Sequence, residues 1–317
     1  MFFKHKHTMS HLYYTTNLVD APKYIFKGID TENDLVFVPD FMMQPRSFVR
    51  KVLKFLLVGR LPISGRWVER ITGYKGYQWL TTLQPGDRLL LNGIVNLKTL
   101  RAVKWLLPDG VRPFQYFNNC LRFVMPPEKV GRSVKKMQEM GYNLLTFDPE
   151  EASEYGMTYT PQFYRFPEPW HDNICYDFFF CGMIKDRGER LNTLKTQLEA
   201  KGYKCKFIIV GDGNDTKISY EEYLDYVRKS RCLVDLFQQG QIGLTRRPLE
   251  ALFFNKKLLT ENMQVADFDF YRQENIFIIG HDTWDGIDHF MDETALVMIP
   301  DDIKQRYDVR QWLKNFK

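Results

Sequence analysis

Short apolar runs alternate with stretches of helical spacing along the first half of the chain. The runs predict strands and the spaced stretches predict helices, in the order strand 34–40, helix 46–58, strand 87–92, helix 97–107, a strand within 113–124, helix 129–140 and strand 143–147. The strands are apolar almost throughout, as in a sheet that is covered on both faces. Because strands that alternate with helices usually pair in parallel, we expect a Rossmann-like α/β domain here. Residues 23–27 predict one more short strand.

The second half repeats the alternation. Its predicted elements are strand 176–182, helix 189–201, strand 206–210, helix 219–229, strand 232–237, a short helix from Pro248, strand 258–260 and a terminal helix within 300–316. A capping box, Ser219 with Glu222 three positions later, begins the fourth of these elements. The pattern indicates a second Rossmann-like domain.

Residues 149–172 interrupt the alternation. The segment holds four prolines and several aromatic residues but no period, which is typical of a linker. A chain of 317 residues suits two domains of about 150 residues each. We therefore predict one domain at 1–155 and a second at 156–317.

Residues 238–262 follow a buried strand and combine a polar loop, a short helix and a second strand. Arg246 and Arg247 lie at the start of the helix, where free backbone N–H groups attract phosphate. Glu250, one turn later, is placed to accept hydrogen bonds from ribose hydroxyls. This combination predicts a nucleotide site.

The motif G-L-T-x-R-x-x-E-A-L, which begins at Gly243, is followed by N-K-K-L-L-T-E-N, which begins at Asn255. Together they resemble the donor-site segment of bacterial GT-B glycosyltransferases of lipopolysaccharide core and capsule biosynthesis, and the resemblance extends over residues 144–279. It implies two Rossmann-like domains with a cleft between them and a C-terminal helix that returns to the first domain. In that arrangement the domain 1–155 is on the acceptor side and the domain 156–317 binds a nucleotide-sugar donor. The donor-binding positions that it implies are Gly182, Lys185, Arg187, Gly243, Thr245, Arg247, Glu250 and Asn262.

One position departs from the pattern of that superfamily. Many of its members carry two glutamates eight positions apart; Glu250 matches the second, whereas Ile242 occupies the position of the first. The leading hypothesis is a glycosyltransferase that acts on a lipopolysaccharide-core, O-antigen or capsule acceptor. Two alternatives stay open: a non-catalytic glycan-binding or scaffold protein of the same pathway, and a sugar-nucleotide isomerase.

An inverting transfer needs a general base for the acceptor hydroxyl. Asp40, at the end of the strand 34–40, is the predicted base. Asp267 and Asp269 have the spacing of a metal-binding carboxylate pair, but they come after the donor-type loop, so we predict neither a metal nor another cofactor. The sequence has no G-x-S-x-G elbow and no Walker A motif.

The formal net charge of +5 is concentrated in one segment. Residues 46–75 contain eight basic residues against Glu69 alone, with apolar and aromatic residues between them. This composition favours peripheral contact with a membrane or an anionic, lipid-linked saccharide acceptor, and its helical spacing argues against nucleic acid as a partner. Five scattered cysteines and a start without a signal-peptide pattern predict a cytoplasmic protein, peripheral to the inner membrane.

Overall fold

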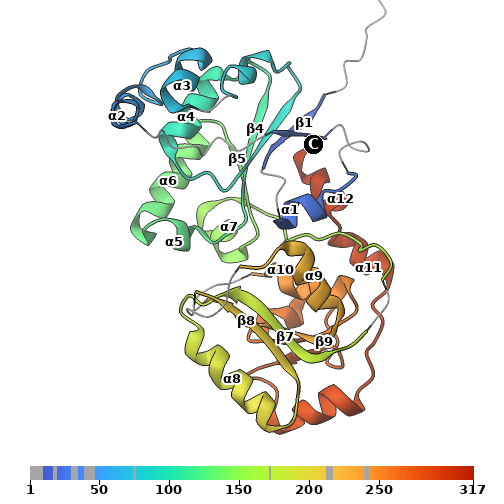
Figure 1. Cartoon of the computed structure of the whole chain (residues 1–317). Coiled ribbons are helices and arrows are strands. Elements are labelled where there is room, and N and C mark those ends of the chain that lie inside the picture. Colours follow the sequence, from blue (N-terminus) through green and yellow to red (C-terminus); the bar gives the residue numbers. More distant parts are fainter. Residues whose placement is uncertain are drawn as a thin grey trace, which may run out of the picture. The chain divides into compact units, whose positions relative to one another are not determined.

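The computed structural model describes residues 10–16, 20–29, 35–38, 47–73, 76–170, 173–211, 217–238 and 243–317 (Figure 1). The chain divides into two compact units. The first comprises Met1–Thr160 together with Leu313–Lys317, and the second comprises Pro161–Trp312.

The first unit is built on a six-stranded sheet in which all strand pairs are parallel. Its order is β2-β1-β3-β4-β5-β6. The strands are β1 (Leu12–Thr15), β2 (Leu35–Val38), β3 (Arg88–Asn92), β4 (Arg112–Phe117), β5 (Asn143–Thr146) and β6 (Thr158–Tyr159).

Helices cover both faces of this sheet (Figure 1). They are α1 (Asp20–Ile25), α2 (Phe48–Leu57), α3 (Gly65–Thr72), η1 (Trp79–Thr82), α4 (Leu97–Leu106), α5 (Leu121–Val124), α6 (Pro127–Glu139), α7 (Pro149–Tyr155) and the terminal turn η5 (Leu313–Phe316). Leu89 and Leu91 of β3 share one buried cluster with residues of α4 and α6. On the opposite face Phe114 of β4 packs edge-on against Phe316, with ring centroids 5.6 Å apart.

The second unit is built on a five-stranded parallel sheet of order β11-β10-β9-β7-β8. Its strands are β7 (Tyr176–Met183), β8 (Cys205–Val210), β9 (Ser230–Asp235), β10 (Lys257–Thr260) and β11 (Ile276–Ile278). Its helices are α8 (Gly188–Ala200), α9 (Tyr220–Arg228), α10 (Arg246–Phe253), η2 (Met263–Asp267), η3 (Trp284–Gly286), η4 (His289–Glu293), α11 (Asp301–Arg306) and α12 (Val309–Trp312).

Alternate residues of β7 face opposite sides of this second sheet. Phe178 and Phe180 join a buried cluster with the leucines of α8. Phe179 points the other way and packs on Tyr223 and Tyr226 of α9, each at a centroid distance of 5.4 Å. Because both faces are covered, the strands are apolar throughout, which is why they could be located in the sequence.

The α/β class with two parallel, helix-covered sheets is confirmed. The serine of the predicted capping box also caps its helix, since Ser219 Oγ accepts a hydrogen bond from the Glu222 N–H at 3.1 Å. Among the described residues, no helix has the length and apolar content needed to cross a bilayer.

Four details differ from the sequence expectation. The predicted strand 23–27 is wrong, because most of it lies in helix α1 and the turn after it. Strand β1 was not predicted. The predicted linker 149–172 contains α7, because Pro149 takes the first helical position and Asp148 accepts hydrogen bonds from the N–H groups of Glu150 and Glu151.

The fourth difference concerns the predicted terminal helix, which is broken at Asp308. The backbone of Tyr164 pairs there with the chain, donating to the Tyr307 carbonyl at 2.9 Å and accepting from the Val309 N–H at 2.7 Å. This bridge interrupts the helical hydrogen bonds. The residues beyond Trp312 then belong to the first unit, as the resemblance implied.

Candidate functional site

The strand order of the second unit points to the carboxyl ends of β7 and β9. These two strands are neighbours in the sheet. Helix α8, which follows β7, covers one face of the sheet. Helix α10, which follows β9, packs with α9, and the tyrosines of α9 cover the opposite face. In doubly wound sheets ligands bind where the chain changes sides in this way. Most of the predicted donor positions lie on the two segments that follow these strands.

Asp235, the last residue of β9, is the centre of a buried polar cluster. The residue is 2% exposed. Thr245 Oγ1 donates to its carboxylate at 3.1 Å, Thr260 Oγ1 donates at 3.3 Å, and an Arg247 nitrogen lies 3.8 Å away. Burial raises the pKa of Asp235, while Arg247 and the hydroxyls oppose that rise. The sequence prediction missed Asp235, although it is the one charged residue in the apolar run 232–237.

Arg247 connects β7 and β9 by hydrogen bonds at this edge of the sheet. It donates to the carbonyls of Val234 on β9 and Cys181 on β7, and its guanidinium lies 4.9 Å from the centre of the Phe180 ring. Burial opposes its charge, but the neighbouring Tyr223, Asp235 and Glu250 raise the pKa of Arg247 above its ordinary value. It is therefore a permanently charged group held at the end of the sheet.

Arg187 brings a second guanidinium to the same aromatic ring. Its carbon Cζ lies 5.2 Å from the centre of the Phe180 ring, and its nitrogens donate to the carbonyls of Leu236 and Met183. Burial and the nearby Arg247 lower the pKa of Arg187 to about 10. An anion placed beside these two like charges would relieve their repulsion.

Gly182 allows Arg187 to take this position. A Cβ atom on Gly182 would lie 2.9 Å from Nη2 of Arg187 and 3.3 Å from the Phe180 ring. Lys185, which has a positive φ of 46°, is exposed and donates to Oε1 of Gln238 at 3.1 Å. The turn after β7 thus places a lysine and an arginine two positions apart.

The segments after β9 and β10 are joined by Gly243 and Asn262. Asn262 Nδ2 donates to the Gly243 carbonyl at 3.2 Å, and the Gly243 N–H donates to Oε1 of Gln264 at 3.2 Å. Gly243 has a φ of 92°, a conformation that favours glycine. The structure therefore brings together two predicted donor positions that are 19 residues apart in sequence.

Glu250 on α10 is hydrogen-bonded to side chains of α9. Its side chain is 4% exposed, and its two oxygens accept hydrogen bonds from the hydroxyls of Tyr220, at 3.0 Å, and Tyr223. Burial raises the pKa of Glu250, and burial beside this carboxylate also raises the pKa of both tyrosines. In this arrangement the carboxylate binds tyrosine hydroxyls, the same type of group that ribose would offer.

The first unit has its own polar cluster beyond the ends of β4 and β5. Asp148 pairs with Arg122 at 2.8 Å and also accepts from the Cys120 thiol at 3.1 Å. Cys120, Asp148 and Glu151 are close enough together to surround an ion, but Asp148 already caps α7 and neutralises Arg122. Asp40, the predicted general base, lies outside the described residues.

The chain has matches among solved structures, but none among family models or curated sequences. No protein-family model matches the chain, and no curated protein matches it in sequence. Twenty-one chains of solved structures match. One of them is HepE from Anabaena in complex with UDP, with 11% sequence identity, a TM-score of 0.48, and coverage of 97% of this chain and 98% of that chain.

Proposed function

We propose that this protein is a glycosyltransferase whose second unit binds a nucleotide-sugar donor at the carboxyl ends of β7 and β9. The observation that carries the proposal is the pair Arg187 and Arg247, two guanidiniums against the ring of Phe180 at the edge where doubly wound sheets bind ligands. A diphosphate carries negative charge, which would compensate the two positive charges. The G-L-T-x-R motif around Arg247 gives the same indication independently.

Seven of the eight predicted donor residues divide into two groups by their contacts, and Glu250, which accepts from two tyrosines, belongs to neither. Arg187 is partly buried and Lys185 is exposed, so these two would bind the diphosphate oxygens. Gly243, Thr245, Arg247 and Asn262 would hold the segments in place through hydrogen bonds, and Gly182 would leave room for Arg187.

In the proposed reaction the acceptor oxygen forms a bond to the anomeric carbon of the donor sugar. The bond from that carbon to the diphosphate oxygen breaks, and its electron pair leaves with the diphosphate, whose charge Lys185 and Arg187 would stabilise. The acceptor proton passes to a general base, for which Asp40 stays the prediction. The proposed acceptor is a lipopolysaccharide-core, O-antigen or capsule glycan, and no metal is required.

The test is a thermal-shift screen with the diphosphates of uridine, guanosine, cytidine and thymidine and with their sugars, in magnesium and in EDTA. A ligand that binds only the folded protein raises its melting temperature. We expect one nucleotide to raise it equally in both buffers, and Arg187→Ala to remove the effect. Lys195→Ala, which alters a surface pair with Glu199 on α8, is the matched control and should leave the shift intact. A screen without any shift would overturn the donor-site proposal.

A non-catalytic glycan-binding or scaffold protein is the second candidate, and Glu250 is the observation that favours it. The carboxylate expected to hold the ribose is occupied by two tyrosines, and Ile242 stands where many relatives of the superfamily carry another glutamate. Nucleotide binding would then occur without turnover. Release of nucleoside diphosphate from any nucleotide-sugar, with or without an acceptor glycan, would exclude this candidate.

A further inference from the structure

Helix α2 of the first unit directs its apolar side chains into solvent. None of its residues is buried, and Phe48 is 79% exposed. At 100° per residue its apolar residues form one continuous arc of the helical wheel, and Arg50, Lys51 and Lys54 fill the remainder. An ordinary surface helix faces its apolar arc towards the core, whereas in α2 only Leu57 packs against the core and most of the arc is exposed.

Neighbouring residues extend this apolar surface. Leu61, in the connection after α2, is 51% exposed, and Trp67 of α3 is 56% exposed. Figure 1 shows α2 beside α3 at the periphery of the first unit. We refer to the exposed apolar residues of α2 with Leu61 and Trp67 as the apolar face.

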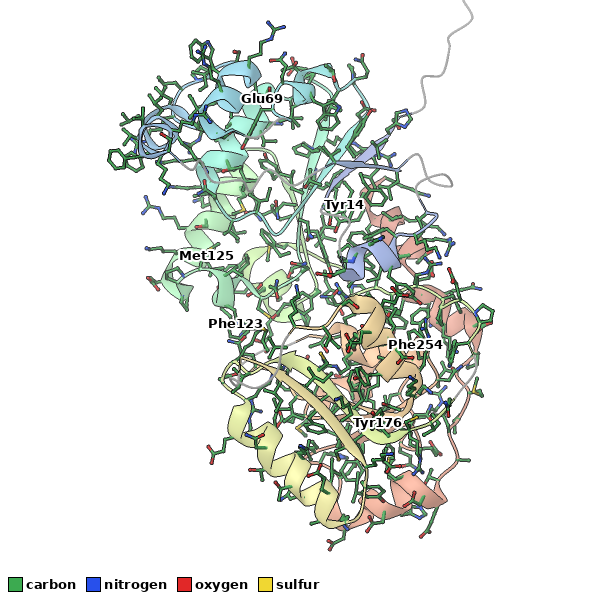
Figure 2. All side chains as sticks on the ribbon, in the orientation of Figure 1. Tyr14, Glu69, Phe123, Met125, Tyr176 and Phe254 are labelled. Atoms are coloured by element: carbon green, nitrogen blue, oxygen red, sulfur yellow. The ribbon has the colours of Figure 1, made fainter. Side chains whose placement is uncertain are left out.

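The surroundings of the apolar face are basic. Arg60, Arg66 and Arg70 join the three cations of α2, and Glu69 is the one acidic residue between Phe48 and Gly73. Glu69, labelled in Figure 2, accepts hydrogen bonds from the N–H groups of Gly76 and Gln78 at 2.8 and 2.9 Å. The Glu69 carboxylate therefore binds backbone N–H groups of the segment that follows α3.

Three lysines gather where α2 meets α4. Lys51, Lys54 and Lys98 line a cavity of about 210 Å³ together with Phe55, Val58, Asn96 and Thr99, and none of the described residues that line it is a carboxylate. Lys98 Nζ donates to the Phe55 carbonyl at 3.2 Å and lies 3.9 Å from the centre of the Phe55 ring. Burial lowers the pKa of Lys54, and burial together with Arg60 lowers the pKa of Lys98, so an anion in the cavity would stabilise both charges.

We propose that the apolar face enters the surface of an anionic membrane and that Lys51, Lys54 and Lys98 bind the phosphate of a lipid headgroup. An apolar helical face bordered by cations is the arrangement that binds the boundary between acyl chains and anionic headgroups. Charge complementarity selects this occupant, since an apolar protein partner would leave the surrounding cations without counter-charges. The inference does not depend on the donor site, and its test contains no nucleotide.

The test is flotation of the full chain with vesicles of phosphatidylglycerol and phosphatidylcholine, compared with pure phosphatidylcholine. We expect binding to the anionic vesicles that weakens as salt is added, because exposed charges are screened. Each lysine near an anionic surface contributes about fivefold to affinity, so Lys51→Gln, Lys54→Gln and Lys98→Gln together should weaken binding roughly a hundredfold. Phe48→Ser should weaken it roughly tenfold or more while leaving the melting temperature unchanged, since that side chain is already exposed.

The matched control removes the same charge elsewhere on the first unit. Lys129→Gln, Arg132→Gln and Lys135→Gln alter three exposed cations of α6, and we expect near wild-type binding. If both triple variants lose the same amount of vesicle affinity, the proposed lysine site is wrong. If the chain binds neutral and anionic vesicles equally, the proposed role of charge is wrong. If light scattering shows a dimer, and Phe48→Ser dissociates it, a second copy of the chain covers the apolar face and the membrane proposal is wrong. A thermal shift with glycerol phosphate, without vesicle binding, would assign the cavity to a soluble phosphate instead.

Discussion

The carboxylate of Asp235 and the guanidinium of Arg247 lie 3.8 Å apart at the carboxyl edge of the second sheet. The Asp235 side chain is 3% exposed and the Arg247 side chain 15% exposed. Asp235 therefore helps to keep Arg247 charged at the end of the sheet, next to the two segments that would hold a diphosphate. It also fixes how β7 and β9 end, since Arg247 binds carbonyls of both strands.

Replacing Asp235 by Asn should destabilise the second unit strongly. The variant leaves Arg247 largely buried without its counter-charge, and breaking a buried pair in this way costs about 3–5 kcal/mol. Urea unfolding followed by circular dichroism measures the loss. Asp225→Asn is the control, because its partner Lys229 lies on the surface of α9, and it should change the free energy of unfolding far less. Equal effects would show that the Asp235 charge is unimportant.

Glu250 should make stability depend on pH. Burial raises its pKa in the folded state, so folding becomes less favourable as the pH rises from the ordinary glutamate value through the raised one. Glu250→Gln removes this dependence. The free energy of unfolding of Glu250→Gln, relative to wild type, should therefore increase as the pH rises above the ordinary pKa of a glutamate, by about 1.4 kcal/mol for each unit of the pKa shift.

Urea titrations of both proteins at several pH values test the Glu250 prediction. Asp235 and Glu261, whose pKa values are also raised chiefly by burial, are present in both proteins and cancel in the difference. A difference that stays constant with pH would contradict the prediction.

Gly182→Ala should weaken nucleoside diphosphate binding while preserving the fold. The new Cβ would displace the end of Arg187, a flexible side chain, from the Phe180 ring. Losing one charge-assisted hydrogen bond to phosphate reduces affinity by about 10- to 100-fold. Titration calorimetry measures this loss. Gly286→Ala is the control, since a Cβ there meets no atom within 4 Å. Unchanged affinity in Gly182→Ala would argue against Arg187 as a diphosphate ligand.

Phe316→Ala should destabilise the first unit, although it lies at the end of the chain. Phe316 is fully buried and packs on Phe114 of β4, while its carbonyl accepts from Arg88 of β3 at 3.1 Å. Truncating a buried phenylalanine costs about 3–5 kcal/mol. Phe48→Ala, at an exposed phenylalanine of the same unit, should change the free energy of unfolding little. Similar values for the two variants would show that the terminal turn is not part of the core.

The elements of the proposed donor site could be located from the sequence, whereas the partners of its side chains could not. Pro248 and the apolar residues around it indicated α10, although the helix begins two residues earlier, at Arg246. The hydrogen bonds of Glu250 come from Tyr220 and Tyr223, about thirty positions earlier on α9. No local pattern connects these positions, because they meet only when both helices pack on the same face of the sheet.

The sequence by itself determined the α/β class and most of the strands, because strands covered on both faces must be apolar along their whole length. It also singled out residues 238–262 as the predicted nucleotide site and the concentration of bases from Arg46 to Lys75. The strand order, and with it the meeting of Arg187 and Arg247 on one phenylalanine ring, was decided only by the tertiary structure. So was the outward direction of the apolar arc of α2. The physical reason is that pairing of distant strands and the choice of which helix face is buried depend on contacts between residues far apart in the chain.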